Sequence, residues 1–321
     1  MPAPLPANTS RAHLAGKRIA VSVSDSPDLA RLGLLPREVD RALTAITTGL
    51  VYAGATIAYG GDLRPGNYTR LMMTDAIRAY RTAEMKSFAP IVHHYVAAST
   101  WSTWSCEELT RHVRSFNHMA TVHIVCANGL SHELNGGDDA IVLLRAGSSE
   151  REEIREDNVH ELEALWHTND ASISPAFALT LMREAMASDC HARIVLGGRV
   201  SGYAGDGPGV GEEAFITLGM GKPVIALGGF GGCARDIAVA LGFLDDEDRL
   251  PPIDPAVTYC PTIHAVADEA KTELGRRALA MLPRDLARTA AREDTPETLA
   301  ILCTQLLKEA LAPVDRTERA P

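Results

Sequence analysis

The residues with the most evident chemical potential lie in the stretch Gly205-Asp-Gly-Pro-Gly-Val-Gly-Glu-Glu-Ala214. Glycine lets a backbone approach a ligand closely, and the amides at the start of a helix attract an anion. A short apolar run, Ile194 to Leu196, precedes this stretch and is typical of a buried strand. Strand, glycine loop and helix start together predict a phosphate site made by the backbone of Gly207, Gly209, Val210 and Gly211.

Two glutamates, Glu212 and Glu213, open the helix that follows this loop. One interpretation is charge complementarity, because a helix dipole favours carboxylates in its first turn. A carboxylate beside a phosphate also repels it, so the alternative is that Glu213 faces a sugar ring. There it could hold ribose hydroxyls or stabilise the oxocarbenium character that glycosidic cleavage develops at C1′. Both glutamates are therefore candidate site residues, and Glu213 is a candidate catalytic residue.

Arg183 is the second candidate catalytic residue. It lies in an apolar helical segment that starts at Ser174-Pro175, a capping serine followed by proline. The planar guanidinium suits phosphate or carboxylate, and a buried arginine without a partner is costly. Arg183 is thus expected to clamp the ligand phosphate. The alternative is a structural ion pair with a glutamate.

Three predicted strands end in a Gly-Gly pair, at 60–61, 197–198 and 228–229. The carboxyl ends of parallel strands share one edge of a sheet, where open α/β folds bind ligands. The pairs therefore predict a common crevice, although each could also be a simple strand-ending turn. The glycine-loop residues assigned to this crevice are Gly60, Gly61, Gly197, Gly198, Gly228, Gly229, Phe230 and Gly231.

Polar side chains accompany the ends of the first two strands. Ser22, Ser24 and Asp25 close the first strand, and Asp62 and Arg64 follow the second. All five could reach the same crevice and complete its far side. Turn formation and helix capping are the alternative roles.

Several common site types are missing from the pattern. His93 and His94 alternate across a strand and cannot share one metal, and no other spacing suggests a metal site. Neither a Walker A sequence nor a strict dinucleotide fingerprint after the first strand is present. Trp101 and Trp104 could stack on a base or simply pack. No metal or resident cofactor is expected.

The elements that must position these residues alternate between strand and helix along the chain, which predicts a Rossmann-like α/β fold with a doubly wound, mostly parallel sheet. The expected strands are 18–24, 55–59, 91–97, 121–126, 139–144, 194–196 and 223–227. Helices are expected at 36–53, 69–80, 107–116, from 175, from 212, and at 264–282 and 295–311.

This pattern divides the chain into a ligand-binding domain at 16–245 and a helical C-terminal extension at 246–312. Residues 147–168 are dense in charge and predict a solvated helical insertion. Residues 1–15 and 313–321 have the composition of disordered tails.

Composition narrows the function classes. A net charge of −10 argues against a basic surface for nucleic acid or anionic membrane. No secretory signal and no membrane span are expected from the apolar runs. The six cysteines are scattered without a C-x-x-C pair, which favours reduced thiols and a cytoplasmic location.

With these motifs the chain resembles the SLOG superfamily, which groups LOG-type phosphoribohydrolases, DprA-like proteins and nucleotide-sensor domains. LOG enzymes carry R-x-x-M on a helix, then a strand, then P-G-G-x-G-T-x-x-E. Arg183 and Met186 match the first part, and the stretch Gly207-Pro-Gly-Val210 with Glu213 matches the second. Asp206 stands in place of the motif's first glycine, Val210 replaces threonine, and the loop before the motif is longer.

Three other stretches resemble more closely the bacterial SLOG branch associated with SIR2 and TIR proteins in nucleotide signalling and anti-phage defence. They are Val21 to Ser26, Tyr59 to Arg64 and Gly228 to Gly232. The resemblance spans about residues 17–242. In sensor relatives it implies a pocket for NAD-derived cyclic nucleotides, with arginine on the phosphate. In LOG relatives it implies cleavage of the N-glycosidic bond of a nucleoside 5′-monophosphate.

The two functional hypotheses are thus a sensor or accessory protein that binds a nucleotide or ADP-ribose-like ligand, and a nucleotide phosphoribohydrolase. The retained Arg183 and Glu213 favour the enzyme, whereas the altered motif and the signalling-branch likeness favour the sensor. A nucleotide-binding protein of metabolic role is a third possibility. The family analogy implies a homodimer, and a sensor lacking an effector domain implies a partner protein.

Overall fold

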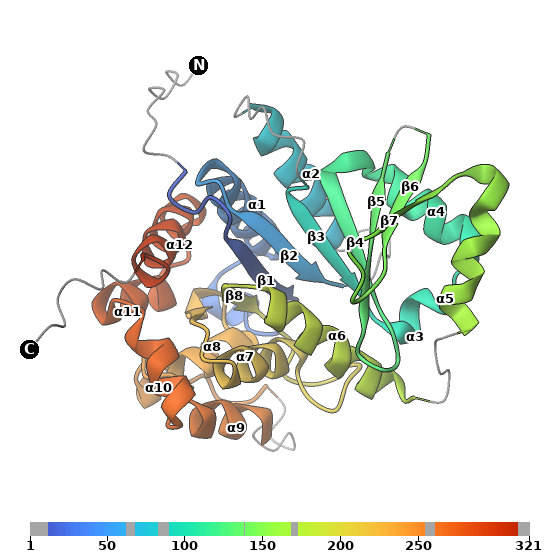
Figure 1. Ribbon diagram of the computed structural model, residues 1–321. Coiled ribbons are helices and arrows are strands. Elements are labelled where there is room, and N and C mark those ends of the chain that lie inside the picture. The colour runs from blue at the N-terminus through green and yellow to red at the C-terminus, as the bar shows by residue number, and fades with distance from the viewer. Residues whose placement is uncertain are drawn as a thin grey trace, which may run out of the picture.

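The computed structural model describes residues 12–61, 68–82, 90–137, 139–167, 173–253 and 261–313. Within these ranges the strands form one nine-stranded sheet in the order β7-β6-β5-β4-β3-β2-β1-β8-β9 (Figure 1). Six neighbouring strands pair in parallel, which confirms the Rossmann-like α/β prediction. These parallel strands are β1 Arg18–Ser24, β2 Thr56–Gly60, β3 Val92–Val96, β4 Ala120–Val125, β8 Ala192–Gly197 and β9 Val224–Leu227.

The other three strands extend the sheet beyond β4 in antiparallel pairing. They are β5 Ser131–Gly136, β6 Ile141–Leu144 and β7 Arg151–Ile154. The sequence predicts β6 but neither β5 nor β7. Ser131 to Gly136 is mostly polar and Arg151 to Ile154 mostly charged, because an edge hairpin needs little apolar surface and depends on pairing with its neighbour.

Helices cover both faces of the parallel part (Figure 1). The helices of the first 253 residues are α1 Pro36–Tyr52, α2 Tyr68–Thr82, α3 Ala98–Trp101, α4 Cys106–Ser115, α5 Glu163–His167, α6 Pro175–Asp189, α7 Gly209–Gly219 and α8 Gly232–Ala240. Short 3-10 turns lie at η1 Ala30–Leu32, η2 Asn117–Met119, η3 Glu156–Leu162, η4 Gly228–Phe230 and η5 Asp246–Asp248.

The two faces of the central strands differ in side-chain size. Ile19 and Val21 of β1 belong to the large core that includes α1 and α8. Ala20 and Ala58, on the opposite face, pack with Met182 of α6. Small residues on that face let α6 lie close to the sheet, and this positions Arg183, the next residue of the helix.

Two expectations about the chain ends are corrected. Residues 12–15 are not a disordered tail: Leu14 is fully buried and its amide donates to the Ala53 carbonyl at 2.9 Å. The expected helix at 264–282 is two helices, α9 Pro261–Glu269 and α10 Glu273–Ala280, because the Thr272 side chain caps a new helix. The helix α11 Arg284–Arg292 was not predicted, whereas α12 Pro296–Ala310 matches the expected 295–311.

The charged segment at 147–168 is only partly helical. It begins with the edge strand β7, and helical structure starts at Glu156 with η3 and continues into α5. The predicted helical insertion is therefore wrong for its first part, since β7 pairs with β6 through backbone hydrogen bonds to which side-chain charge is irrelevant. None of the helices in the described ranges combines the length and apolarity that a bilayer crossing requires.

Candidate functional site

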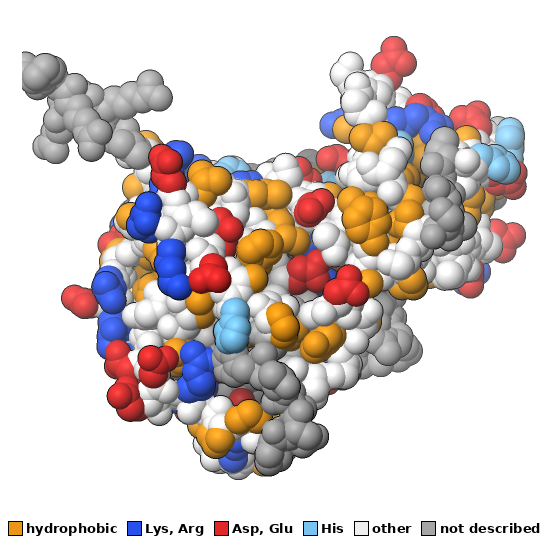
Figure 2. Space-filling view, turned by 90° about the horizontal axis from the view of Figure 1, so that it is seen from below, with side chains coloured by type: hydrophobic (Ala, Val, Ile, Leu, Met, Phe, Trp, Pro, Cys, Tyr) orange, Lys and Arg blue, Asp and Glu red, His pale blue; other side chains and the backbone are white. Residues whose placement is uncertain are grey.

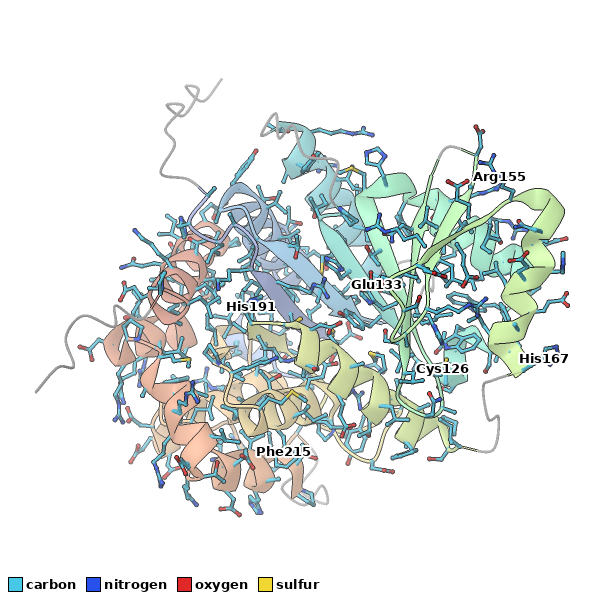
Figure 3. The ribbon with its side chains drawn as sticks, in the orientation of Figure 1. Cys126, Glu133, Arg155, His167, His191 and Phe215 are labelled. Carbon is cyan, nitrogen blue, oxygen red and sulfur yellow. The ribbon has the colours of Figure 1, made fainter. Side chains whose placement is uncertain are left out.

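The carboxyl ends of β1, β2, β8 and β9 lie along one edge of the sheet. Figure 3 helps to find the edges, since Cys126 directly follows β4 at the carboxyl edge and His191 directly precedes β8 at the amino edge. The loops after β1 and β8 touch there, because the Gly198 amide donates to the Ser24 carbonyl at 2.9 Å. A Cβ on Gly197, whose φ is 62°, would lie 2.6 Å from the same oxygen. Glycine is thus required at Gly197 by backbone contact.

An exposed polar group covers this contact. Arg199 pairs with Asp25 at 2.7 Å, and its amide donates to the Ser24 hydroxyl at 3.2 Å. The Tyr68 hydroxyl at the start of α2 donates to Asp25 at 3.1 Å. The structure therefore brings Ser24 and Asp25 to the expected edge, where protein side chains engage them.

Helix α7 begins at Gly209, three residues before the predicted start at Glu212, and no described side chain caps its N-terminus. Its cap position is Pro208, which has no polar side chain. The first amides of an α-helix have no partner within the helix, so those of Gly209, Val210 and Gly211 remain available for an anion.

The guanidinium of Arg183 lies next to the first residue of α7. The residue is 7% exposed, and its Nη1 donates to Oε2 of Glu212. The other oxygen of Glu212 accepts from the Thr180 hydroxyl at 2.5 Å. A Cβ on Gly209 would lie 2.7 Å from Arg183 Nη2, so the guanidinium touches the loop backbone. The structural ion pair and the predicted clamp position thus coexist.

The side chain of Glu213 points to the sheet, towards β1 and β8. Its Oε2 accepts from the Ser22 hydroxyl and, at 2.5 Å, from Arg193 Nη1. Arg183 Nε lies 3.7 Å from the remaining oxygen, Oε1. The two glutamates and two arginines balance in formal charge, so only the helix amides and the local geometry, and not a net charge, could favour an anion here.

Arg193 is the site residue that the sequence reasoning missed. It is fully buried in β8 and contacts Ser22, Glu213 and, at 2.7 Å, the Thr217 hydroxyl. The available signal was an arginine inside the otherwise apolar run Ala192–Gly197. A charge in a buried strand needs a buried partner, and Glu213 is that partner.

The glycines on either side of Gly209 have protein neighbours of their own. A Cβ on Gly207 would lie 2.3 Å from the Thr262 hydroxyl of α9, and one on Gly211 would lie 3.1 Å from Thr262 Cγ2. A Cβ on Gly205 would lie 3.2 Å from Arg183 Nη1. The C-terminal helix α9 therefore packs against the glycine loop, a contact that the sequence did not suggest.

Gly60 and Gly61 reach the same edge at the end of β2. A Cβ on Gly60 would lie 2.6 Å from the Met182 sulfur, which explains the close approach of α6. The Gly61 carbonyl is 2.9 Å from the His94 ring. The predicted site residues Asp62 and Arg64 lie outside the described residues.

The glycine loop at 228–231 has no space for a ligand, because other parts of the protein lie against it. A Cβ on Gly229 would lie 2.1 Å from the Glu293 carbonyl, and Phe230 is fully buried. Beside Gly231, whose φ is 70°, the Asp28 carboxylate accepts from the Gly232 amide at 2.6 Å. This carboxylate occupies the start of α8, where a ligand anion would bind. Gly228, Gly229, Phe230 and Gly231 thus serve packing, and the prediction that they line a ligand crevice is corrected.

The histidines of β3 point to opposite faces, as alternation predicts. His93 is 3.0 Å from His123, whereas His94 is 3.3 Å from His112. Burial lowers the pKa of His93 and of His112 to about 3. Across the described part of the chain, no group of three or more His, Cys, Asp or Glu side chains is placed to hold a metal ion.

The comparisons with known proteins identify a family for most of the chain. A family model described as SLOG cluster2 matches residues 13–248. The match covers the sheet and the helices α1 to α8, and it ends before α9. No curated protein and no solved structure matches the chain.

Proposed function

This chain belongs to the SLOG family, and from that membership we propose that it binds a nucleotide or an NAD- or ADP-ribose-derived ligand. The ligand phosphate lies on the amides of Gly209, Val210 and Gly211, with Arg183 beside it. The sugar faces Glu213, and Ser24 and Asp25 lie at the far side of the crevice.

The contrast between two neighbouring helix starts carries this proposal. Both α7 and α8 follow a glycine loop at the carboxyl edge of the sheet. The α8 start is occupied by the Asp28 carboxylate, whereas the α7 start has no cap among the described side chains and has Arg183 beneath it. An uncapped helix start next to a buried guanidinium is suited to an anion such as phosphate.

Binding without turnover is favoured by how the acidic groups are engaged. Glu213 Oε2 already accepts two hydrogen bonds, and Glu212 already pairs with Arg183. The second candidate is hydrolysis of a nucleotide N-glycosidic bond, and Glu213 Oε1 favours it. This oxygen accepts no hydrogen bond from a described residue and lies beside Arg183, where it could stabilise positive charge on a sugar.

The biological role that fits a binding site of this kind is a cytoplasmic sensor or accessory protein in bacterial nucleotide signalling or anti-phage defence, acting with an effector partner. Self-association is part of the proposal, since the adjacent helices α6 and α7 expose Phe177 by 51% and Phe215 by 37%. Figure 3 labels Phe215 on α7. Light scattering of the purified chain tests the proposed self-association.

The face in Figure 2 shows basic side chains mainly towards one side rather than a continuous basic surface.

The test incubates the purified protein with AMP, NAD, ADP-ribose and cyclic ADP-ribose, and follows both thermal shift and release of free base. We expect a thermal shift without base release. Arg183→Ala should weaken binding at least tenfold, because the phosphate loses a buried charged donor worth roughly 2 kcal/mol or more. Arg145→Ala, which breaks an ion pair with Glu152 in the antiparallel part of the sheet, several strands away from β1 and β8, is the matched control.

The outcomes separate the two functions. Base release that disappears in Glu213→Gln would establish the hydrolase and displace the sensor. If the Arg183→Ala variant folds and binds the ligand with unchanged affinity, the proposed position of the phosphate at the start of α7 is refuted.

A further inference from the structure

We propose that Arg193 is the positioning residue of this site: it holds Glu213 so that one carboxylate oxygen, Oε1, is presented to the ribose hydroxyls of the ligand. This inference rests on the proposed function. Arg193 is fully buried, so it acts on the ligand only through Glu213.

The geometry around Arg193 is that of a fixed scaffold. Nη1 donates to Glu213 Oε2 at 2.5 Å and to the Ser22 hydroxyl at 2.6 Å. The Ser22 hydroxyl in turn donates to the same carboxylate oxygen. Nε donates to the Thr217 hydroxyl at 2.7 Å, and that hydroxyl donates to the Glu213 carbonyl at 2.7 Å. Both the side chain and the backbone of Glu213 are thereby tied to one guanidinium.

The sheet register explains why these groups meet. Ala20 of β1 lies opposite Arg193, and Ser22 lies opposite Val195, so Arg193 and Ser22 share the face covered by α7. Glu213 and Thr217 are four residues apart on α7, and both therefore point at that face. An arginine is needed because its planar fork bonds several acceptors in fixed directions, which a lysine ammonium does not.

This arrangement leaves the two oxygens of Glu213 unequal. Oε2 is saturated by Arg193 and Ser22, whereas Oε1 has no hydrogen-bond donor among the described residues. The side chain of Glu213 is 10% exposed, and Oε1 faces Arg183 Nε at 3.7 Å. A sugar hydroxyl can donate to such an oxygen, and a ligand without that hydroxyl leaves it unsatisfied. The site is thus expected to prefer ribose over dideoxyribose ligands.

The test measures affinities for AMP and for 2′,3′-dideoxy-AMP by calorimetry. The wild type is expected to prefer AMP by about tenfold or more, because hydrogen bonds to charged groups are worth roughly 1.5–3 kcal/mol. Arg193→Lys should reduce this preference to less than about threefold and leave the dideoxy-AMP affinity nearly unchanged. The control is Arg18→Lys on the neighbouring strand β1, where Arg18 bonds Tyr95 and Asp189 instead.

A double-mutant cycle separates positioning from simple loss of stability. If Arg193 acts through Glu213, Arg193→Lys causes no further loss of AMP preference in a Glu213→Gln background. If Arg193→Lys does not fold, the double variant Arg193→Met with Glu213→Gln removes the charges as a pair and takes its place. Its AMP preference should equal that of Glu213→Gln alone.

Each result has a defined meaning. A retained AMP preference in Arg193→Lys, or equal losses of affinity for both ligands, would overturn the proposal. A wild type that binds both ligands equally would overturn it too, and would leave nucleotide binding intact. If the wild type binds neither ligand, AMP is not a ligand of this site, and the proposed function is then decided by NAD, ADP-ribose and cyclic ADP-ribose. A crystal structure of Arg193→Lys then decides the positioning role: Glu213 displaced from Ser22 supports it, and an unmoved Glu213 refutes it.

Discussion

At the scale of single residues, we expect Glu212 to determine how readily the proposed site accepts an anion. Its carboxylate bonds Arg183 through one oxygen and Thr180 through the other. It therefore occupies one donor of the guanidinium that the ligand phosphate would use. In the proposed site Glu212 would compete with the ligand, because it neutralises the arginine and would repel an incoming phosphate.

Replacing Glu212 by glutamine is therefore expected to strengthen binding of AMP by about three- to tenfold, which corresponds to roughly 0.7–1.4 kcal/mol. The gain should be largest at low ionic strength, since salt screens the repulsion. Titration calorimetry at two salt concentrations measures it. Glu184→Gln, an exposed position on α6, is the control for net charge. Weaker binding in Glu212→Gln would mean that the carboxylate contacts the ligand favourably.

At the scale of elements, the site depends on which helix starts are satisfied. The Ser174 side chain caps α6, Asp28 caps α8, and α7 has no cap among the described side chains. Asp28 comes from the loop after β1, so it also ties that loop to the loop after β9. A side-chain acceptor thus satisfies the starts of α6 and α8, and the proposed ligand phosphate would serve the start of α7 in the same way.

Asp28→Ala is expected to lower the free energy of unfolding by about 1–2 kcal/mol, because α8 loses its cap and its favourable dipole interaction. Urea denaturation measures the change. The comparison is Asp25→Ala, whose ion pair with Arg199 is largely exposed and is worth less than about 1 kcal/mol. An Asp25 effect as large as that of Asp28 would contradict this ranking.

At the scale of the whole molecule, the C-terminal helices are an integral part of the fold. Helix α9 packs on the glycine loop through Thr262, the chain at Glu293 covers Gly229, and Gly49 of α1 is in close contact with Ala300 of α12. The family match ends at residue 248, yet residues beyond it shape the site. The left side of Figure 1 shows this group of helices wrapped around the β1, β8 and β9 end of the sheet.

Buried histidines on β3, β4 and α4 make the stability of the protein depend on pH. Burial lowers the pKa of His93 and His112 to about 3, and lowers that of His123 well below its usual 6.5. Below about pH 6.5 the unfolded chain therefore binds protons that the folded protein does not. Above about pH 6.5 these histidines leave the free energy of unfolding unchanged. As the pH drops below that value, each histidine lowers the free energy of unfolding by about 1.4 kcal/mol per pH unit.

His112→Phe should reduce the slope of the unfolding free energy against pH, below about pH 6.5, by about 1.4 kcal/mol per pH unit, which corresponds to one proton. Urea denaturation at pH 7.5, 6.5 and 5.5 measures the slope. A matched control replaces the exposed His167, which Figure 3 labels near the end of α5. The same slope in His112→Phe as in the wild type would refute the assignment of the acid loss to buried imidazoles.

What the sequence determined by itself is the part that local patterns encode. Apolar runs predicted the parallel strands, and the glycine loop with Glu212 and Glu213 predicted a helix there, although α7 starts three residues earlier than expected. The serine and proline at 174–175 predicted the start of α6, which positions Arg183. These features involve residues close together in the chain, so they can be recognised without knowledge of the fold.

Only the tertiary structure decided which charges meet. Arg193 and Ser22 are 171 residues apart, and Asp28 lies 204 residues from the amide that it caps. The glycines at 228–231 have the same sequence character as those at 207–211, and only the positions of Asp28 and Glu293 show that the former are filled. Hydrogen bonding and burial depend on neighbours in space, and sheet order brings those neighbours together irrespective of their separation along the chain.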